Sequence, residues 1–372
     1  MGRAPARPAR LSPPALLLRA ALQSDPTEVG GLAADLRPAD WDRLAKLAEY
    51  HEVVPLIWPV LRRAPIPPDL AERWRAAYYL VAVRNDSRIA EITALAAELA
   101  EHSIRPVLLK GMALAPFVYQ NLALRQMGDT DLLVRRADLR VAWAVLSARG
   151  YLLQPAAARY WRFQFRNSGE LRLVHHRSTA MIELHWWLYA GTWAAQSGLL
   201  PAAGFWGRLR EASLEGAPVL RLHPHDEALH IAFHLAVSNQ FGEGVGRMLV
   251  DWDRLIRAGP PNWPRLAREA RDLRLATVLW LVARVARALL GTPVPSDLAA
   301  LAPSFWRRAL LNRLIRPEHL LAGHDPRRTA AGRYLLLLLL FDRFRDSLGM
   351  LRRGLAELIG DRWPVVGGRW LR

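Results

Sequence analysis

Acidic residues in two short apolar segments constrain the fold of this chain more than any other feature. Asp129 and Asp131 begin an apolar segment that ends at Val134, and Glu183 lies within the apolar run 180–186. Both segments predict short strands, in which side chains at every second position share a face. Neighbouring carboxylates repel each other unless a cation lies between them. If the two strands pair, the three carboxylates form one cluster, whose oxygens suit Mg²⁺ or Mn²⁺.

The turn after an earlier apolar segment adds features of a phosphate site. Lys110 and Gly111 follow a strand predicted at 106–109 and precede a predicted helix. A glycine there lets the backbone approach a phosphate, and the helix N-terminus favours negative charge. Arg125 has two interpretations: it holds a phosphate with its planar guanidinium, or it pairs with one of the aspartates and orients it. Three carboxylates beside a phosphate site predict phosphoryl transfer with two metal ions.

The apolar periodicity changes twice along the chain and predicts an α+β fold. Helical spacing dominates 15–104, short strands and helices alternate in 105–215, and helical spacing returns in 216–372. The Pro- and Arg-rich residues 1–14 predict a flexible tail, and the Gly-containing stretch 191–216 shows no clear pattern. We therefore expect a small mixed-sheet domain flanked by N-terminal helices and a C-terminal helical domain. Besides 106–109, strands are expected at 129–134, 151–153, 160–165, 171–176 and 180–186.

The composition excludes several classes of site. The absence of cysteine excludes disulfides, Cys-ligated zinc, iron–sulfur clusters and thiol nucleophiles, and is compatible with the cytoplasmic location that we expect. The net charge is +17, but only Lys46 and Lys110 among the 51 basic residues are lysines. Because the arginines are spread along the whole chain, they predict a solvated basic surface and not a nucleic-acid groove. The apolar run 334–341 is far shorter than the ~20 residues that cross a membrane, so no membrane partner is expected.

A second polar pattern occurs in the C-terminal region. Asp226, His230 and His234 follow one another at four-residue spacing on one face of a predicted helix. This spacing fits metal ligands or a polar patch that faces the catalytic domain. Because the sequence offers no further ligand nearby, the polar patch is the preferred interpretation.

Three motifs surround the residues singled out above. They are Leu-Leu-Lys-Gly at 108–111, Arg-Gln-Met-Gly-Asp-Thr-Asp-Leu-Leu-Val at 125–134 and Glu-Leu-His-Trp at 183–186. Together they resemble a bacterial family of uncharacterised nucleotidyltransferases in the DNA polymerase beta-like superfamily. Classical members of that superfamily have Gly-Gly or Gly-Ser at the turn, where this chain has Lys110-Gly111-Met112. The resemblance covers most of residues 40–350 and extends to Tyr119, Gly150-Tyr151, His230, His234 and Leu249-Val250-Asp251.

The resemblance implies a magnesium-dependent transferase. Such an enzyme moves a nucleoside monophosphate from a nucleoside triphosphate such as ATP to an acceptor and releases pyrophosphate. Glu183 would also help to deprotonate the acceptor hydroxyl. The catalytic residues and metal ligands would be Asp129, Asp131 and Glu183. The residues that bind the donor nucleotide would be Lys110, Gly111, Arg125 and His185.

The sequence does not determine the acceptor. Some members of the family lie in clusters for peptide natural products, which makes a peptide or a small molecule of a biosynthetic pathway a candidate. Two other functions also stay open: the same fold could use a nucleotide-sugar donor, or the chain could be a non-catalytic binding protein. The complete set of three carboxylates argues against the binding protein, and nothing in the sequence decides between the donors.

Overall fold

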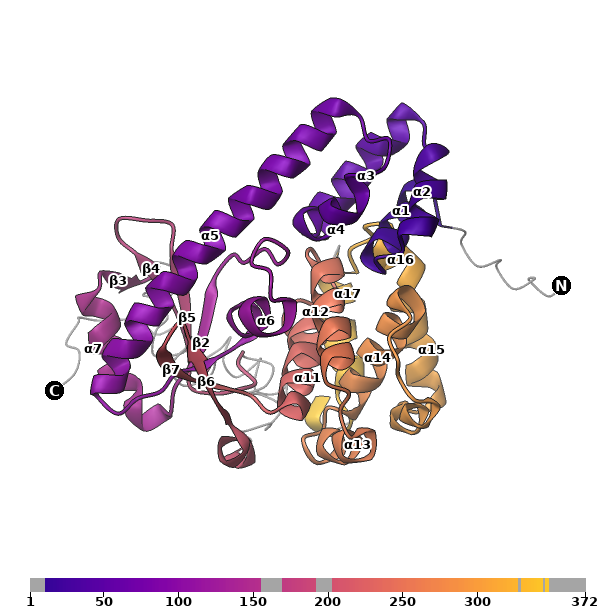
Figure 1. The fold of residues 1–372 in the computed structure, drawn as a ribbon. Coiled ribbons are helices and arrows are strands. Elements are labelled where there is room, and N and C mark those ends of the chain that lie inside the picture. Colours follow the sequence, from indigo (N-terminus) through magenta and orange to yellow (C-terminus); the bar gives the residue numbers. More distant parts are fainter. Residues whose placement is uncertain (1–10, 155–168, 192–202, 327–328, 344, 348–372) are drawn as a thin grey trace.

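The fold is mixed α+β, with helices at both ends of the chain around one seven-stranded sheet (Figure 1). This confirms the predicted fold class. The protein is described here by a computed structural model. The strand expected at 160–165 and residues 1–10 of the expected tail lie outside the described residues, whereas the first helix begins within that tail, at Pro13. The described residues are 11–154, 169–191, 203–326, 329–343 and 345–347.

Helices α1 to α5 precede the sheet, and each has a proline in its first turn. Proline suits this position because its fixed φ matches the helix and its missing N–H would have no intrahelical partner. The last of the five is by far the longest and ends where the first strand is about to begin. Their bounds are Pro13–Leu22, Pro26–Ala34, Pro38–Tyr50, Val54–Leu61 and Pro68–Glu101.

The sheet has the strand order β3-β4-β5-β2-β1-β7-β6. The central strands β5, β2 and β1 are the most buried, and two of the pairings, β2 with β5 and β1 with β7, are parallel. The helix α7 (Leu139–Ala148) connects β2 to β3. In chain order the strands are Val107–Leu108, Thr130–Leu133, Tyr151–Leu153, Glu170–His175, Met181–His185, Arg210–Leu214 and Ala217–Arg221.

The hairpin of β6 and β7 lies in a stretch for which the sequence predicted no strand. Glu215 and Gly216 join the two strands, and both have positive φ, +46° and +94°. Two such residues form the type I′ turn, whose twist matches that of the flanking strands. The sheet therefore extends to Arg221, and the boundary expected between 215 and 216 falls inside this turn. The division into domains remains a prediction.

The long helix α5 connects two hydrophobic cores. Its first half contributes Leu70 and Trp74 to a core that the N-terminal helices share with the C-terminal helices. Its second half contributes Ile92 and Leu99 to the core between the sheet and α7. Figure 1 shows α5 running from the N-terminal helices to the sheet. The C-terminal helices lie to the right of the sheet in this view, beyond α6 (Lys110–Leu114). These are α11 (Pro224–Phe233), α12 (Val245–Ala258), α13 (Trp263–Asp272), α14 (Ala276–Leu290), α15 (Phe305–Leu314), α16 (Pro317–Leu321) and α17 (Ala330–Leu340).

The strongly apolar run near the C-terminus forms α17, a helix of 11 residues. Its buried side chains Leu336, Leu339 and Leu340 belong to the core that the helices share. Within the described ranges, no helix combines the length and the apolar character that a membrane span requires.

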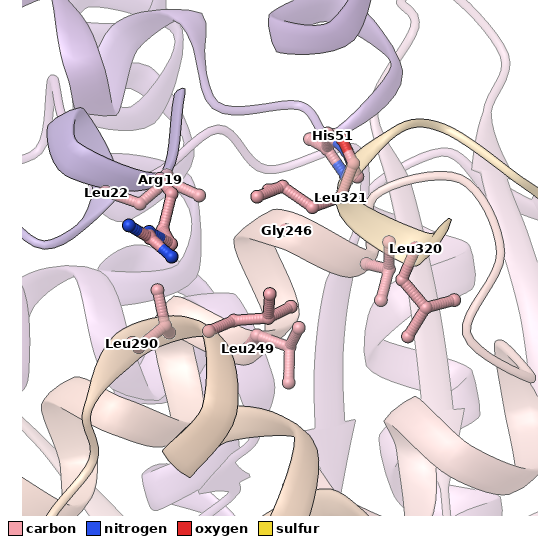
Figure 2. Close-up of a pocket in the computed structure, with 10 residues that line it drawn as sticks. Arg19, Leu22, His51, Gly246, Leu249, Leu290, Leu320 and Leu321 are labelled. Carbon is pink, nitrogen blue, oxygen red and sulfur yellow. The ribbon is translucent and has the colours of Figure 1, made fainter. Parts of the chain in front are cut away.

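The N-terminal and C-terminal helices meet at a closely packed seam. Figure 2 shows leucines from α1, α12, α14 and α16 gathered with His51 around a cavity of about 10 Å³. A space of this size holds one water molecule at most. The His51 ring is buried, and its Nε2 lies 3.0 Å from the carbonyl oxygen of Leu321. Gly246 of α12 lies against this ring, because a Cβ there would stand 2.7 Å from the Cβ of His51.

We expect Gly246→Ala to lower the free energy of unfolding by about 1–3 kcal/mol, because the added methyl group overpacks the seam. Gly31→Ala is the matched control, since Gly31 is exposed in α2 with open space around it. That change should stabilise the chain by about 0.5–1 kcal/mol through helix propensity. Urea unfolding of both variants tests the pair, and equal effects would contradict the packing at Gly246.

A pH dependence follows from the buried imidazole. Burial lowers the pKa of His51 to about 4, against about 6.5 in the unfolded chain. The unfolded chain therefore binds more protons between these values, and stability falls as the pH drops from about 6.5 to about 4, by up to about 3 kcal/mol. The free energy of unfolding in urea should differ less between pH 7.5 and pH 5 for His51→Gln than for the original chain. Equal differences would contradict the prediction.

Candidate active site

The pairing of β2 with β5 determines which side chains meet at the site. In this parallel pair Asp131 lies opposite Glu183, and Leu132 lies opposite Leu184. The two leucines are buried in the core between the sheet and α7. Because side chains alternate along a strand, the two acidic residues project from the other face, where His185 also lies. The apolar residues thus fix the register, since a slip of one position would bury the carboxylates in that core.

Asp131, Glu183 and His185 form a buried cluster. Each offers one potential ligand atom, and the three atoms lie within 4.8 Å of one another. Asp131 Oδ1 accepts a hydrogen bond from Lys110 Nζ at 2.7 Å and lies 3.0 Å from His185 Nε2. Glu183 Oε1 accepts a hydrogen bond from Arg172 Nε at 2.8 Å. Its other oxygen lies 3.6 Å from Lys110 Nζ, so the ammonium group lies between the two carboxylates.

Asp129 precedes the strand and lines the same cavity as the cluster. Burial and the negative charges of Asp131 and Glu183 raise its pKa. Burial alone would also raise the pKa of Asp131, but Lys110 and the contact with His185 hold it well below its usual value. The pKa values of the two aspartates therefore shift in opposite directions. Asp131 is ionised, while Asp129 retains a proton more readily than an exposed aspartate does.

The donor set of the cluster fits a divalent cation. Two carboxylates and an imidazole suit Mn²⁺, and the carboxylate oxygens alone suit Mg²⁺. The four acidic residues of this face outnumber the three basic side chains that pair with them, Lys110, Arg172 and His185. These acidic residues are Asp129, Asp131, Glu170 and Glu183.

Lys110 and Gly111 form the turn from β1 into α6 (Lys110–Leu114). Lys110 has a φ of +46°, in the left-handed region that favours glycine. For a residue with a Cβ, such as this lysine, the left-handed conformation costs about 1 kcal/mol or more. Gly111 has a different constraint, since a Cβ there would collide with the guanidinium of Arg125 and with Met127. The structure thus gives Gly111 a packing role, and phosphate binding by its backbone stays a prediction.

The guanidinium of Arg125 pairs with Asp251 of α12 rather than with Asp129 or Asp131. Its Nη2 donates to Asp251 Oδ2 at 2.8 Å, and the hydroxyl of Tyr119 donates to Asp251 Oδ1 at 2.7 Å. Burial would raise the pKa of Asp251, but Arg125 and Arg247 hold it below its usual value. Arg247 Nε in turn donates to Glu52 Oε2 at 2.7 Å. This network ties the loop before β2 to the helices on both sides of the seam.

The cluster opens into a cavity of about 590 Å³ between the sheet and the C-terminal helices. Lys110, Gly111 and Arg125 also line it, so the cavity brings together every residue that the sequence analysis proposed for catalysis, metal binding or donor binding. The opposite wall is more apolar and comes from α11, the π-helical turn His234–Ser238 and α12. The residues of this wall are His230, Phe233, His234, Val237, Ser238, Asn239, Gln240, Arg247 and Met248.

The two C-terminal histidines lie in this cavity, whereas Asp226 does not line it and instead pairs with Arg208 at 3.1 Å. Burial, with a smaller contribution from Lys110, lowers the pKa of His230 to about 3 and that of His234 well below its usual value. Both rings are therefore neutral at pH 7. Within the described part of the chain, Asp131, Glu183 and His185 form a group of three side chains spaced to hold a metal ion, and His230 and His234 belong to no such group.

Two residues of β4 belong to the site although the sequence analysis did not single them out. Glu170 and Arg172 lie opposite His185 and Glu183 in the antiparallel pairing of β4 with β5. Glu170 Oε2 is 3.3 Å from His185 Nδ1. The available signal was the two-residue spacing of Glu170 and Arg172 in an otherwise apolar strand, which places both on one face.

The fold is consistent with a nucleotidyltransferase domain, and a comparison with protein families agrees. The model of a family described as "Uncharacterised nucleotidyltransferase" matches residues 37–291, more than half of the chain, and the chain belongs to this family. The match runs from the start of α3 to the end of α14 and includes the whole sheet. No curated protein and no solved structure matches the chain.

We expect Asp251→Asn to lower the free energy of unfolding by about 3–5 kcal/mol, because it leaves the buried guanidinium of Arg125 without its counterion. The control is Glu211→Gln, which breaks an exposed ion pair with Arg105. That variant should lose less than about 1 kcal/mol. Urea unfolding compares the two, and similar losses would show that the Arg125–Asp251 pair is not a buried ion pair of this kind.

Proposed function

We propose that the chain catalyses the transfer of a nucleoside monophosphate from a nucleoside triphosphate to the hydroxyl group of a peptide or small-molecule acceptor. Membership of the nucleotidyltransferase family supports the reaction class. The observation that carries the proposal is the position of Asp131 opposite Glu183, beside His185, in a cavity of about 590 Å³. We also propose that the chain belongs to the DNA polymerase beta-like superfamily and acts in a biosynthetic pathway of the cytoplasm.

The residues proposed to hold Mg²⁺ or Mn²⁺ are Asp129, Asp131 and Glu183, with His185 beside them. When bound, the cations neutralise the charge of a triphosphate. In the reaction, the acceptor oxygen forms a bond to the α-phosphorus of the donor. The bond from that phosphorus to the bridging oxygen breaks, and pyrophosphate leaves. Lys110 and Arg172 line this wall, and we propose that they contact the phosphates.

The acceptor hydroxyl must lose its proton, and we propose that a carboxylate lining this cavity takes it. Glu183 was expected to do so, but its oxygens face Arg172 and Lys110. Asp129 forms no ion pair with any side chain in the described ranges, and its pKa is raised by burial and its acidic neighbours. A base of raised pKa accepts a proton more readily. We therefore assign the proton to Asp129 and keep Glu183 as a ligand.

The acceptor is placed against the wall formed by α11 and α12. This wall offers apolar contacts from Phe233 and Met248 beside the neutral ring of His230. A neutral imidazole can donate one hydrogen bond and accept another. A hydroxyl or amide of a peptide or small molecule fits this chemistry better than a second polyphosphate does.

Equilibrium binding of the four nucleoside triphosphates and of common nucleotide sugars, each with and without Mg²⁺, tests the donor. We expect Mg²⁺-dependent binding of at least one triphosphate. Preference for a nucleotide sugar would replace the proposed reaction with glycosyl transfer. Absence of any nucleotide binding would favour a non-catalytic protein of the same fold.

We expect Asp131→Asn to abolish the release of pyrophosphate from the triphosphate that binds. The rise in melting temperature that a bound divalent cation produces should disappear as well, because that rise requires binding to the folded state. The variant should also lose roughly 1–3 kcal/mol of stability, since Lys110 and His185 lose a charged partner. Glu211→Gln is the control and should keep both the activity and the response to the cation. Unchanged turnover in Asp131→Asn would reject the assignment.

A further inference from the structure

The ammonium group of Lys110 lies between two carboxylates that would otherwise repel each other. Its ammonium nitrogen is 2.7 Å from Asp131 Oδ1 and 3.6 Å from Glu183 Oε2. These two carboxylates, with His185, form the group that has metal-binding geometry. The Lys110 side chain is only 14% exposed, and it reaches the carboxylates from a backbone in the left-handed conformation. A monovalent cation supplied by the chain therefore lies between two proposed metal ligands.

A divalent cation bound to the same oxygens would exclude this arrangement. Mg²⁺ binds carboxylate oxygens at about 2.0–2.1 Å, so it would lie within a few ångströms of the ammonium group. Two cations so close in a buried site repel each other strongly. Lys110 must then leave the space between the carboxylates, while its stem stays at the wall of the cavity.

We propose that Lys110 is an internal counterion of the acidic cluster, which competes with the divalent cation and leaves the cluster when that cation binds. This inference rests on the proposed function. Before the cation arrives, Lys110 holds Asp131 and Glu183 together against their mutual repulsion. Once displaced, its ammonium group faces the cavity, where a phosphate of the donor is a suitable partner.

Arg172 does not fill the same role. It pairs with Glu183 alone, and its side chain is 47% exposed. It therefore lies at the rim of the cluster and can stay on the outer oxygen of Glu183 while the inner oxygens bind a cation. Of the lysine and the arginine at the cluster, Lys110 is the one that contacts both carboxylates.

Titration calorimetry with Mn²⁺ and Mg²⁺ tests the competition. Lys110→Met keeps the length of the side chain and removes the charge, and we expect it to bind the cation at least tenfold more tightly. The control is Lys46→Met, because Lys46 is the other lysine of the chain and is exposed on α3. It should bind like the original chain. Unchanged or weaker binding by Lys110→Met would overturn the proposal.

Labelling of the original chain gives a second measurement that does not depend on the folding of a variant. An amine-specific reagent has only two lysine side chains to modify, and mass spectrometry of the peptides separates them. We expect Mn²⁺ to increase the labelling of Lys110 at least fivefold while that of Lys46 stays constant. Lys110 labelling that Mn²⁺ leaves unchanged would overturn the proposal.

The two experiments also separate this inference from the proposed function. If the original chain binds Mn²⁺ and Asp131→Asn does not, the metal site stands. If Lys110→Met then binds Mn²⁺ no more tightly than the original chain, and Mn²⁺ does not increase the labelling of Lys110, the counterion role alone is overturned. If neither the original chain nor Lys110→Met binds a divalent cation at millimolar concentration, the counterion role and the proposed function fail together.

Discussion

The parallel pairing of β2 with β5 fixes the position of the cluster, and the rest of the site depends on it. Only four residue pairs form this contact, yet they set Asp131 beside Glu183 on one face and leucines on the other. The energy that holds the register comes from the buried apolar face, because the carboxylate face by itself is repulsive. The side chains that stabilise the core therefore also determine the geometry of the chemistry.

A second constraint comes from outside the sheet. Asp251 of α12 binds the guanidinium of Arg125, and Gly111 leaves the room that this guanidinium needs. The loop before β2 and the turn after β1 are thus held by one buried arginine, which is itself held by a helix of the C-terminal region. Changes at the seam between the helices can reach the cluster through Arg247, which contacts both Glu52 and Asp251.

The sequence predicted the parts of the site that follow from local pattern. Alternation along two short strands was enough to place Asp131 and Glu183 on one face, and the charge of both required a partner. The pairing of Arg125 with Asp251 could not be predicted in this way, since 126 residues separate them and no periodicity relates them. The β6–β7 hairpin was missed because β6 carries little apolar signal and because Pro218 in β7 argues against a strand.

The same reasoning explains why the shared core of the helices was not foreseen. An amphipathic stripe shows that a helix is buried but not what covers it. Gln23 donates a hydrogen bond to the carbonyl oxygen of Leu289, 266 residues away, and His51 contacts Leu321 over 270 residues. The expected regions 15–104 and 216–372 therefore meet in one core, which no local feature of either region indicates.

Because these contacts join distant parts of the chain, the helices on their two sides are synthesised at different times. The ribosome releases the N-terminal helices long before their partners α12, α14 and α16, so their apolar faces remain uncovered while most of the chain is made, and contacts of such span form slowly. The strands of the cluster, in contrast, are complete by Arg221. The strands that carry the carboxylates are therefore synthesised before α11 and α12, which form the opposite wall of the cavity. Lys110 precedes both Asp131 and Glu183 in the chain, so the nascent protein carries a positive charge for this site from the start.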